Sequence, residues 1–230
     1  MKNTRRFYIR DFEIELLIDS KVYKPSFTSM LIARNIPDLD GLDVLDIGTG
    51  SGILSIIASR LNARRIIATD ISVRALNNAY ENFKINNVWN VELRLGSVFE
   101  PVEDEEFDII ISNPPMTPSH QPLPRYTWGG LDGRWVLDEI IRGAPKHLKN
   151  GGRLIIPTIS LVGIEKTYRL LRDIGFKIRV LDYGYHPFSR RLMNLKKYID
   201  RLDCADYFYD NHGRPCWRVV LYEATMLKHH

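Results

Sequence analysis

Asn113 stands at the end of the β-forming run DIIIS and is followed at once by Pro114 and Pro115. A proline ring removes a ladder donor and fixes φ, so a strand must stop there and present the asparagine side chain. The Asn113 side-chain oxygen and the Pro114 carbonyl can each accept a hydrogen from one planar NH₂ group. Two such acceptors would turn that nitrogen's lone pair toward an electrophile. We therefore predict catalytic roles for Asn113, Pro114 and Pro115, with Met116 packing softly on a flat substrate group.

A glycine-rich loop, LDIGTGSG, supplies a second chemical signal. Glycines in such a loop let the backbone turn tightly and approach a ligand. Asp70 ends the next strand, where an acid can accept from both hydroxyls of a ribose. The spacing G-x-G-x-G is not the dinucleotide fingerprint, and Asp46 just before it disfavours a pyrophosphate and favours a cation. S-adenosylmethionine, with its sulfonium and ammonium groups, fits this pattern; the alternative is a tight turn without a ligand.

The elements that must position these residues alternate between strand and helix. This alternation predicts an α/β, Rossmann-like fold with a seven-stranded, mostly parallel sheet and helices on both faces. A capped helix after Asp70 should bury Val73, Leu76, Tyr80 and Phe83, and KNGG should provide the C-cap of a helix over 134–148. The expected strands are LDVLDIG, RRIIATD, VELRLGS, FDIIISN, GRLIIPT, KIRVLDYG and WRVVLYEATM.

The first part of the chain follows another pattern. FEIELLIDSKVY alternates apolar and polar residues, which indicates a half-buried strand in a small hairpin, followed by a turn and a helix. We therefore expect a short N-terminal β/α extension over 1–40 and the main domain over 41–228.

Composition and charge limit the classes of protein to which the chain can belong. The 230 residues are 44% hydrophobic, and no apolar run reaches about 18 residues, so no membrane span is expected. The chain has no apolar signal core and no CxxC pair, which predicts a cytoplasmic protein without a metal site. A formal net charge of +4 permits an RNA partner without requiring one.

VLDIGTGSG, ATD and SNPP, in this order, resemble the class I S-adenosylmethionine-dependent methyltransferases. The resemblance implies that the glycine loop lies near the methionine part of the cofactor and that Asp70 holds the ribose. It also implies that Ile71 packs on the adenine and that Ser97 and Val98 line the adenine pocket. The cofactor-binding residues expected in this way are Ser29, Asp46, Gly48, Thr49, Gly50, Gly52, Asp70, Ile71, Ser97, Val98 and Asn113.

A second set of segments is similar to the HemK family of protein-glutamine methyltransferases. GGLDG, the KNGG turn and the upstream VYKPSFTSMLI carry this resemblance, with Ser29 where threonine is usual. The short N-terminal part matches the archaeal and eukaryotic branch. Members of that branch often work with a small zinc-binding activator protein, which would pair with the sheet edge formed by VELRLGS.

Together these features predict N-methylation of a planar amide or amino nitrogen in a macromolecule. A protein glutamine, as in translation release factors, is the first hypothesis. An adenine or guanine amino group in RNA is the alternative within enzymes, supported by the basic net charge and by Met116. The stretch SRRLMNLKKYIDRL is predicted to be an amphipathic helix with a solvated face, and a patch that contacts phosphates is the alternative for this stretch. A cofactor-binding module without catalysis is the remaining alternative.

Overall fold

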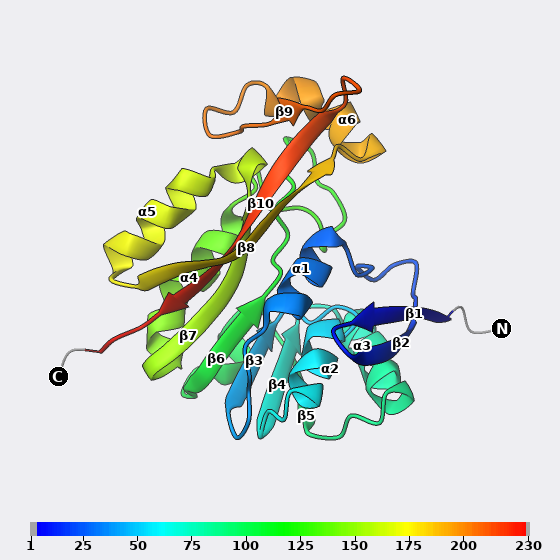
Figure 1. The fold of residues 1–230 in the computed structure, drawn as a ribbon, viewed down its shortest axis with the longest axis vertical. Helices are drawn as coiled ribbons and strands as arrows, with labels where there is room; N and C mark the ends of the chain where they lie inside the picture. The colour runs from blue at the N-terminus through cyan, green and yellow to red at the C-terminus, as the bar shows by residue number, and fades with distance from the viewer. Residues whose placement is uncertain (1–3, 229–230) are drawn as a thin grey trace.

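The computed structural model describes residues 4–228, and a single twisted sheet forms its centre (Figure 1). Seven strands follow one another in the order β5-β4-β3-β6-β7-β10-β8, and the short β9 pairs with β10. All neighbouring pairs from β5 to β7 are parallel, whereas β10 runs antiparallel to both β7 and β8. The predicted fold class is confirmed. The strands are β3 (Asp43–Ile47), β4 (Arg65–Asp70), β5 (Val91–Leu95), β6 (Phe107–Ser112), β7 (Leu148–Ile159), β8 (Lys177–Pro187), β9 (Phe208–Tyr209) and β10 (Pro215–Thr225).

Helices cover both faces of the sheet. The chain moves from β3 toward β5 and later from β6 toward β8, so right-handed crossovers place the two sets of helices on opposite faces. The helices α1, α2 and α3 lie on one face and α4 and α5 on the other (Figure 1). Their bounds are α1 (Phe27–Asn35), α2 (Ile53–Arg60), α3 (Val73–Ile85), α4 (Trp135–His147), α5 (Ile164–Ile174) and α6 (Arg190–Ile199), with 3₁₀ turns η1 (Glu100–Val102) and η2 (Ser160–Val162).

The first described residues form the expected hairpin, β1 (Thr4–Ile9) and β2 (Phe12–Leu17). This two-stranded sheet is separate from the central one, yet Ile14 and Leu16 belong to the same buried cluster as the central strands. A division of the chain at residue 40 stays a prediction.

Three asparagines one turn apart on α3 hold the outer edge of β2. Asn86 accepts from the Glu15 N–H and donates to the Glu15 carbonyl. Asn78 donates to the Leu17 carbonyl, and Asn82 accepts from the Leu17 N–H at 2.7 Å. The asparagine side chains thus satisfy the edge of β2 in place of a third strand.

The predicted apolar stripe on α3 is therefore wrong. Val73 and Tyr80 are exposed, and the buried face carries asparagines and alanines together with Phe83. Polar side chains can take the buried face here because the hairpin backbone bonds them.

The KNGG segment also differs from the prediction. The helix α4 ends at His147, and Leu148 is already extended, so no glycine caps it. The segment instead opens β7, where the Gly151 N–H donates to the Met226 carbonyl beside a register irregularity between β6 and β7.

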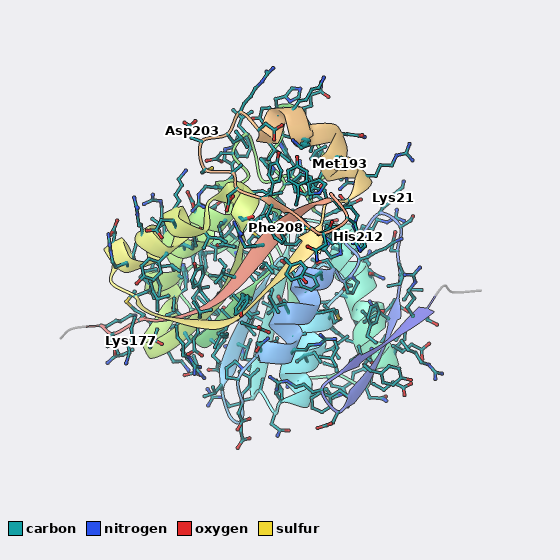
Figure 2. All side chains as sticks on the ribbon, turned by 45° about the horizontal axis from the view of Figure 1, so that its top comes forward. Lys21, Lys177, Met193, Asp203, Phe208 and His212 are labelled. Carbon is teal, nitrogen blue, oxygen red and sulfur yellow. The ribbon has the colours of Figure 1, made fainter. Side chains whose placement is uncertain are left out.

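The segment between β8 and β10 forms a cap on the fold. Figure 1 shows α6 past the end of β8 and β9 beside the start of β10, and in Figure 2 this end comes forward. Ile199 of α6 is fully buried, while Arg190, Arg191 and Lys197 are exposed, as expected for an amphipathic helix. None of the helices within residues 4–228 has the length and hydropathy needed to cross a bilayer.

Candidate active site

The carboxyl ends of four parallel strands bring the predicted residues to one edge of the sheet. Ile47 pairs with Ser112 and with Thr69, so the loop after β3 lies between Asp70 and Asn113. The strand order reverses between β3 and β6, and ligands of open α/β sheets bind at this kind of switch point. The segment after β5, with Ser97 and Val98, joins the same edge because the Gly96 N–H donates to the Asp70 carbonyl.

The glycine loop is held against β4 and leaves free space above it. Gly48 and Gly50 have φ of +73° and +57°, and a Cβ at Gly48 would meet nothing within 4 Å. These two positions can therefore receive a ligand. Gly52 has a different role, since a Cβ there would lie 2.6 Å from the Phe83 ring. The absence of a side chain at Gly52 allows the start of α2 to pack closely against α3.

Asp46 is buried beneath this loop. Its Oδ2 accepts from the Thr49 hydroxyl at 2.8 Å and from the Ser55 hydroxyl at 2.6 Å, and its Oδ1 is buried with no hydrogen-bond partner. Burial raises the pKa of Asp46 to about 6, against the opposing effect of the two hydroxyls. A buried carboxylate with a free oxygen is a site at which a cationic group would be stabilised.

Asp70 is prepared to hold a polar ligand. Its Oδ2 accepts from the Gly50 N–H at 3.0 Å and its Oδ1 from the Ser72 N–H at 2.9 Å, so both oxygens are fixed by the backbone. Burial raises the pKa of this carboxyl, and the backbone N–H groups oppose that rise.

The predicted adenine contacts lie beside Asp70. Ile71 is 51% exposed although it follows a buried strand. Val98 has φ of +44°, an unusual conformation for a β-branched residue, which points to a functional constraint. The Ser97 N–H donates to a Glu100 carboxylate oxygen. The whole edge, from the orphaned Asp46 oxygen to the exposed Ile71, fits an adenosine ligand with a cationic tail.

Asn113 and the two prolines lie next to this edge. The Asn113 Nδ2 donates to the Ser29 hydroxyl at 3.0 Å, and the Ser112 hydroxyl donates to the Ile47 carbonyl at 2.8 Å. Within the described residues, neither Asn113 Oδ1 nor the Pro114 carbonyl receives a hydrogen bond. Two free acceptors therefore stand at the end of β6, as a planar NH₂ group would require.

A recess of about 370 Å³ opens in front of these acceptors. Its floor is the Asn-Pro-Pro-Met segment, and its walls come from the segment before α1, the loop after β6 and the cap. Figure 2 labels Lys21 in the segment before α1 and Met193 on α6 of the cap. The lining residues are Tyr23, Ser26, Phe27, Thr28, Asn113, Pro114, Pro115, Met116, Thr117, Tyr126, Thr127, Ile159, His186, Pro187, Ser189, Arg191, Leu192 and Trp217.

The aromatic walls of this recess were missed from the sequence. Phe27 packs edge-on against Trp217 and near His186, and Tyr23 packs against Tyr126 with 5.9 Å between ring centroids. These residues are spread over the whole chain, and no local pattern joins them. The one usable signal is the excess of aromatic residues flanking the turns before the first helix and after the prolines.

Residues in and around the loop after β6 have packing roles. Trp128 packs at a tilt against Trp135 and donates to the Ser119 carbonyl, and His120 packs on Tyr198. Arg134, at the end of GGLDG, is fully buried, bonded to Asp138 and to the Val162 carbonyl. It fastens the long loop after β6 to the start of α5.

Comparisons with known proteins agree with this arrangement. The family model described as "Methyltransferase small domain" matches residues 23–176. This chain belongs to that family. It is a methyltransferase, and the cofactor-binding module without catalysis is set aside.

Individual relatives refine the picture of this methyltransferase. A protein of Methanocaldococcus jannaschii, provisionally named a protein N5-glutamine methyltransferase, is 36% identical over 186 residues, which are 78% of this chain and 93% of the relative. The release factor glutamine methyltransferase of Xylella fastidiosa is 32% identical over 158 residues, which are 62% of this chain and 58% of that protein. The resemblance to HemK-like proteins is confirmed.

A solved structure supports the fold of the methyltransferase. The ribosomal protein L11 methylase from Lactobacillus delbrueckii subsp. bulgaricus aligns with a TM-score of 0.55 at 24% identity, over 87% of this chain and 77% of that one. At this identity the likeness concerns the fold.

Proposed function

We propose that this methyltransferase transfers the methyl group of S-adenosylmethionine to the side-chain amide nitrogen of a glutamine in a protein. The observation that carries the proposal is the pair of free acceptors, Asn113 Oδ1 and the Pro114 carbonyl, at the floor of the recess. The names of the Methanocaldococcus and Xylella relatives, both glutamine methyltransferases, support this choice of acceptor.

The chain's own groups account for the chemistry. The lone pair of an amide nitrogen is conjugated with its carbonyl, which makes the nitrogen a poor nucleophile. When Asn113 and Pro114 accept both amide hydrogens, the nitrogen gains electron density and its orientation is fixed. S-adenosylmethionine would supply an electrophilic methyl group on a sulfonium centre. The new N–CH₃ bond would replace the S–CH₃ bond, the sulfur would leave as a neutral thioether, and the amide nitrogen would lose one of its two protons to solvent. The fixed ring of Pro114 keeps its carbonyl aimed, and this acceptor needs no reorganisation during the reaction.

The residues proposed to hold the cofactor follow from the geometry of the strand ends. The orphaned oxygen of Asp46 would stabilise positive charge near the glycine loop, and Asp70 would accept from the ribose hydroxyls. Ile71 and Val98 would enclose the adenine from two sides. Gly52 and Thr49 support the loop from beneath in this proposal, since one packs on Phe83 and the other bonds Asp46.

The recess fits a protein substrate. Aromatic side chains form its walls, and Arg191 at its rim donates to the Thr127 hydroxyl. An extended peptide could place one amide side chain at the floor and rest its backbone on these walls. Met116 is only 7% exposed, so it contributes one edge of the floor. This substrate also suits the cytoplasmic location predicted from the sequence.

A small zinc-binding activator protein is a further part of the proposal. The strand β5 ends the sheet, as predicted for VELRLGS, and Leu95 at its end is 57% exposed. Trp89, two residues before this strand, is 73% exposed. An open edge with apolar side chains beside it favours strand pairing with another chain.

The test is transfer of radiolabelled methyl groups to a purified release factor, with the modified residue located by mass spectrometry. The wild-type chain should modify a glutamine, and Asn113→Ala should lower kcat by about 10²–10³, the typical loss of one such electrostatic contact. Cofactor affinity should change little, because this acceptor acts on the substrate nitrogen. Label that enters ribonuclease-sensitive material instead would establish the RNA alternative, and near-normal turnover of Asn113→Ala would leave Asn113 as a turn residue.

A further inference from the structure

The Ser29 hydroxyl connects the first helix to the proposed catalytic amide. Ser29 is 4% exposed and lies in the first turn of α1, where it forms a capping box with Ser26. The Ser26 N–H donates to Ser29 Oγ at 3.2 Å, and the Ser29 N–H donates to Ser26 Oγ at 3.3 Å. The same Ser29 oxygen accepts the Nδ2–H of Asn113 at 3.0 Å.

These contacts use the full hydrogen-bonding capacity of one hydroxyl. A serine hydroxyl accepts two hydrogen bonds and donates one. Ser29 Oγ accepts from the Ser26 N–H and from Asn113, and its own proton can reach Ser26 Oγ at 3.2 Å. No lone pair remains for another ligand, so a contact with a cofactor would require one of these bonds to break.

We propose that Ser29 is a positioning residue that holds the Asn113 amide with its NH₂ turned away from the recess and its oxygen turned toward the acceptor nitrogen. The two ends of an asparagine amide have nearly the same shape, so packing alone does not select between them. In the reversed orientation the Asn113 NH₂ would face the substrate NH₂, donor against donor. This inference rests on the proposed function, because it assigns a direction to the same acceptor.

The positioning role and the cofactor contact expected from the resemblance give different kinetics. Loss of a cofactor contact would weaken the binding of S-adenosylmethionine and leave kcat at saturation unchanged. Loss of the orientation of Asn113 would lower kcat at saturation and leave cofactor affinity unchanged.

The experiment compares three variants with the wild-type chain in the release-factor assay and by calorimetry. Ser29→Ala should lower kcat at saturating cofactor roughly tenfold, the equivalent of one net hydrogen bond, with the cofactor Kd within about twofold. Ser29→Thr keeps the hydroxyl and should restore most of the turnover. Asn35→Ala removes two bonds at the other end of α1, to the Leu31 carbonyl and to Asp182, and should lower stability while kcat stays normal.

A second readout does not depend on turnover. The side-chain ¹⁵N–H₂ signals of Asn113, assigned by their loss in Asn113→Ala, should show one slowly exchanging proton in the wild-type chain and fast exchange of both in Ser29→Ala. Unchanged signals in Ser29→Ala, or a weakened cofactor Kd with normal kcat, would overturn the inference. If the wild-type chain modifies no glutamine, the proposed function fails, while these signals still report the orientation of the amide.

Discussion

At the scale of single residues, the site contains two kinds of polar group. Some are hydrogen-bond acceptors that lack a donor in the described part of the protein, and others already make all the hydrogen bonds they can. The Asp46 Oδ1 and the Asn113 Oδ1 have no protein partner among the described residues, whereas Thr49 and Ser29 are fully engaged. Unsatisfied buried or half-buried acceptors are costly and rare in a folded protein. The two free oxygens therefore mark where ligand groups would bind more clearly than the glycine pattern does.

Asp46 gives a pH-dependent prediction. Its pKa is raised to about 6 in the folded chain, above its unfolded value, so the folded state binds more protons between about pH 4 and pH 6. The stability of the ligand-free chain should therefore fall as pH rises through this window, by up to about 3 kcal/mol from this group. Asp46→Asn should remove that part of the slope and be more stable than wild type at pH 7.5.

Urea unfolding of the wild-type chain and of Asp46→Asn, each at pH 4.5 and pH 7.5, checks this prediction. The pKa of Asp70 is raised as well, but Asp70 is present in both chains, so the difference between their pH dependences reports Asp46. The same substitution should weaken binding of a cationic cofactor at pH 7.5. A variant that is less stable than wild type at pH 7.5 would show that burial does not dominate this carboxyl.

At the scale of elements, the contact between α3 and the N-terminal hairpin reaches the glycine loop. Asn82 accepts from the Leu17 N–H and donates to the Ser51 carbonyl at 2.8 Å. A single buried amide thus joins β2 to the loop that would hold the cofactor. Hairpins of two strands are only marginally stable alone, so β1 and β2 depend on this attachment.

We expect Asn82→Ala to lower the free energy of unfolding by about 2–4 kcal/mol, because it leaves the partly buried Leu17 N–H and the buried Ser51 carbonyl without this partner. Hydrogen exchange of residues 12–17 should accelerate more than that of the central strands. Asn194→Ala, an exposed asparagine on α6, is the matched control and should change neither quantity. Unchanged exchange in the hairpin of Asn82→Ala would mean that apolar packing alone holds β2.

Sequence patterns predicted the central elements well because those elements obey local rules. Buried strands such as β6, with three consecutive isoleucines, carry apolar runs, and Ser72 caps α3 through its bond from the Ala75 N–H. The buried face of α3 was predicted wrongly, since asparagines are buried there only because a distant hairpin bonds them. The recess is likewise assembled from side chains such as Phe27 and Trp217, which only the tertiary fold brings together.

In the candidate site, too, the features that follow from local sequence patterns were predictable, and those that depend on the tertiary fold were not. Asp46, Asp70 and Asn113 lie at the carboxyl ends of three neighbouring strands, and the parallel topology makes their approach predictable. The direction of the Asn113 amide could not be foreseen, because it depends on a hydroxyl 84 positions away. At Gly52 an added Cβ would come within 2.6 Å of the Phe83 ring, so helix packing also requires this glycine, and its predicted contact with the cofactor stays a prediction.

At the scale of the whole molecule, the sheet has two ends of different character. The edge strand β8 exposes Val180, Tyr183 and Tyr185, and the cap lies past the end of this strand (Figure 1). The end at β5 carries the exposed Leu95, with Trp89 just before the strand. Charges also lie on β5, where Arg94 pairs with Glu92 and Glu105, and these discourage pairing only along part of the edge.

If a partner covers the β5 edge, Leu95→Lys should improve the behaviour of the isolated chain. A lysine at an open edge opposes unspecific strand pairing, so light scattering should show fewer large species than for wild type. The same lysine should prevent co-purification with a co-expressed activator protein, because it would be buried in the joint sheet. Leu227→Lys, at a leucine that is 52% exposed after β10, is the matched control for added charge. A wild-type chain that is monomeric, soluble and fully active alone would contradict the need for a partner, and improved behaviour in both lysine variants would assign the effect to net charge.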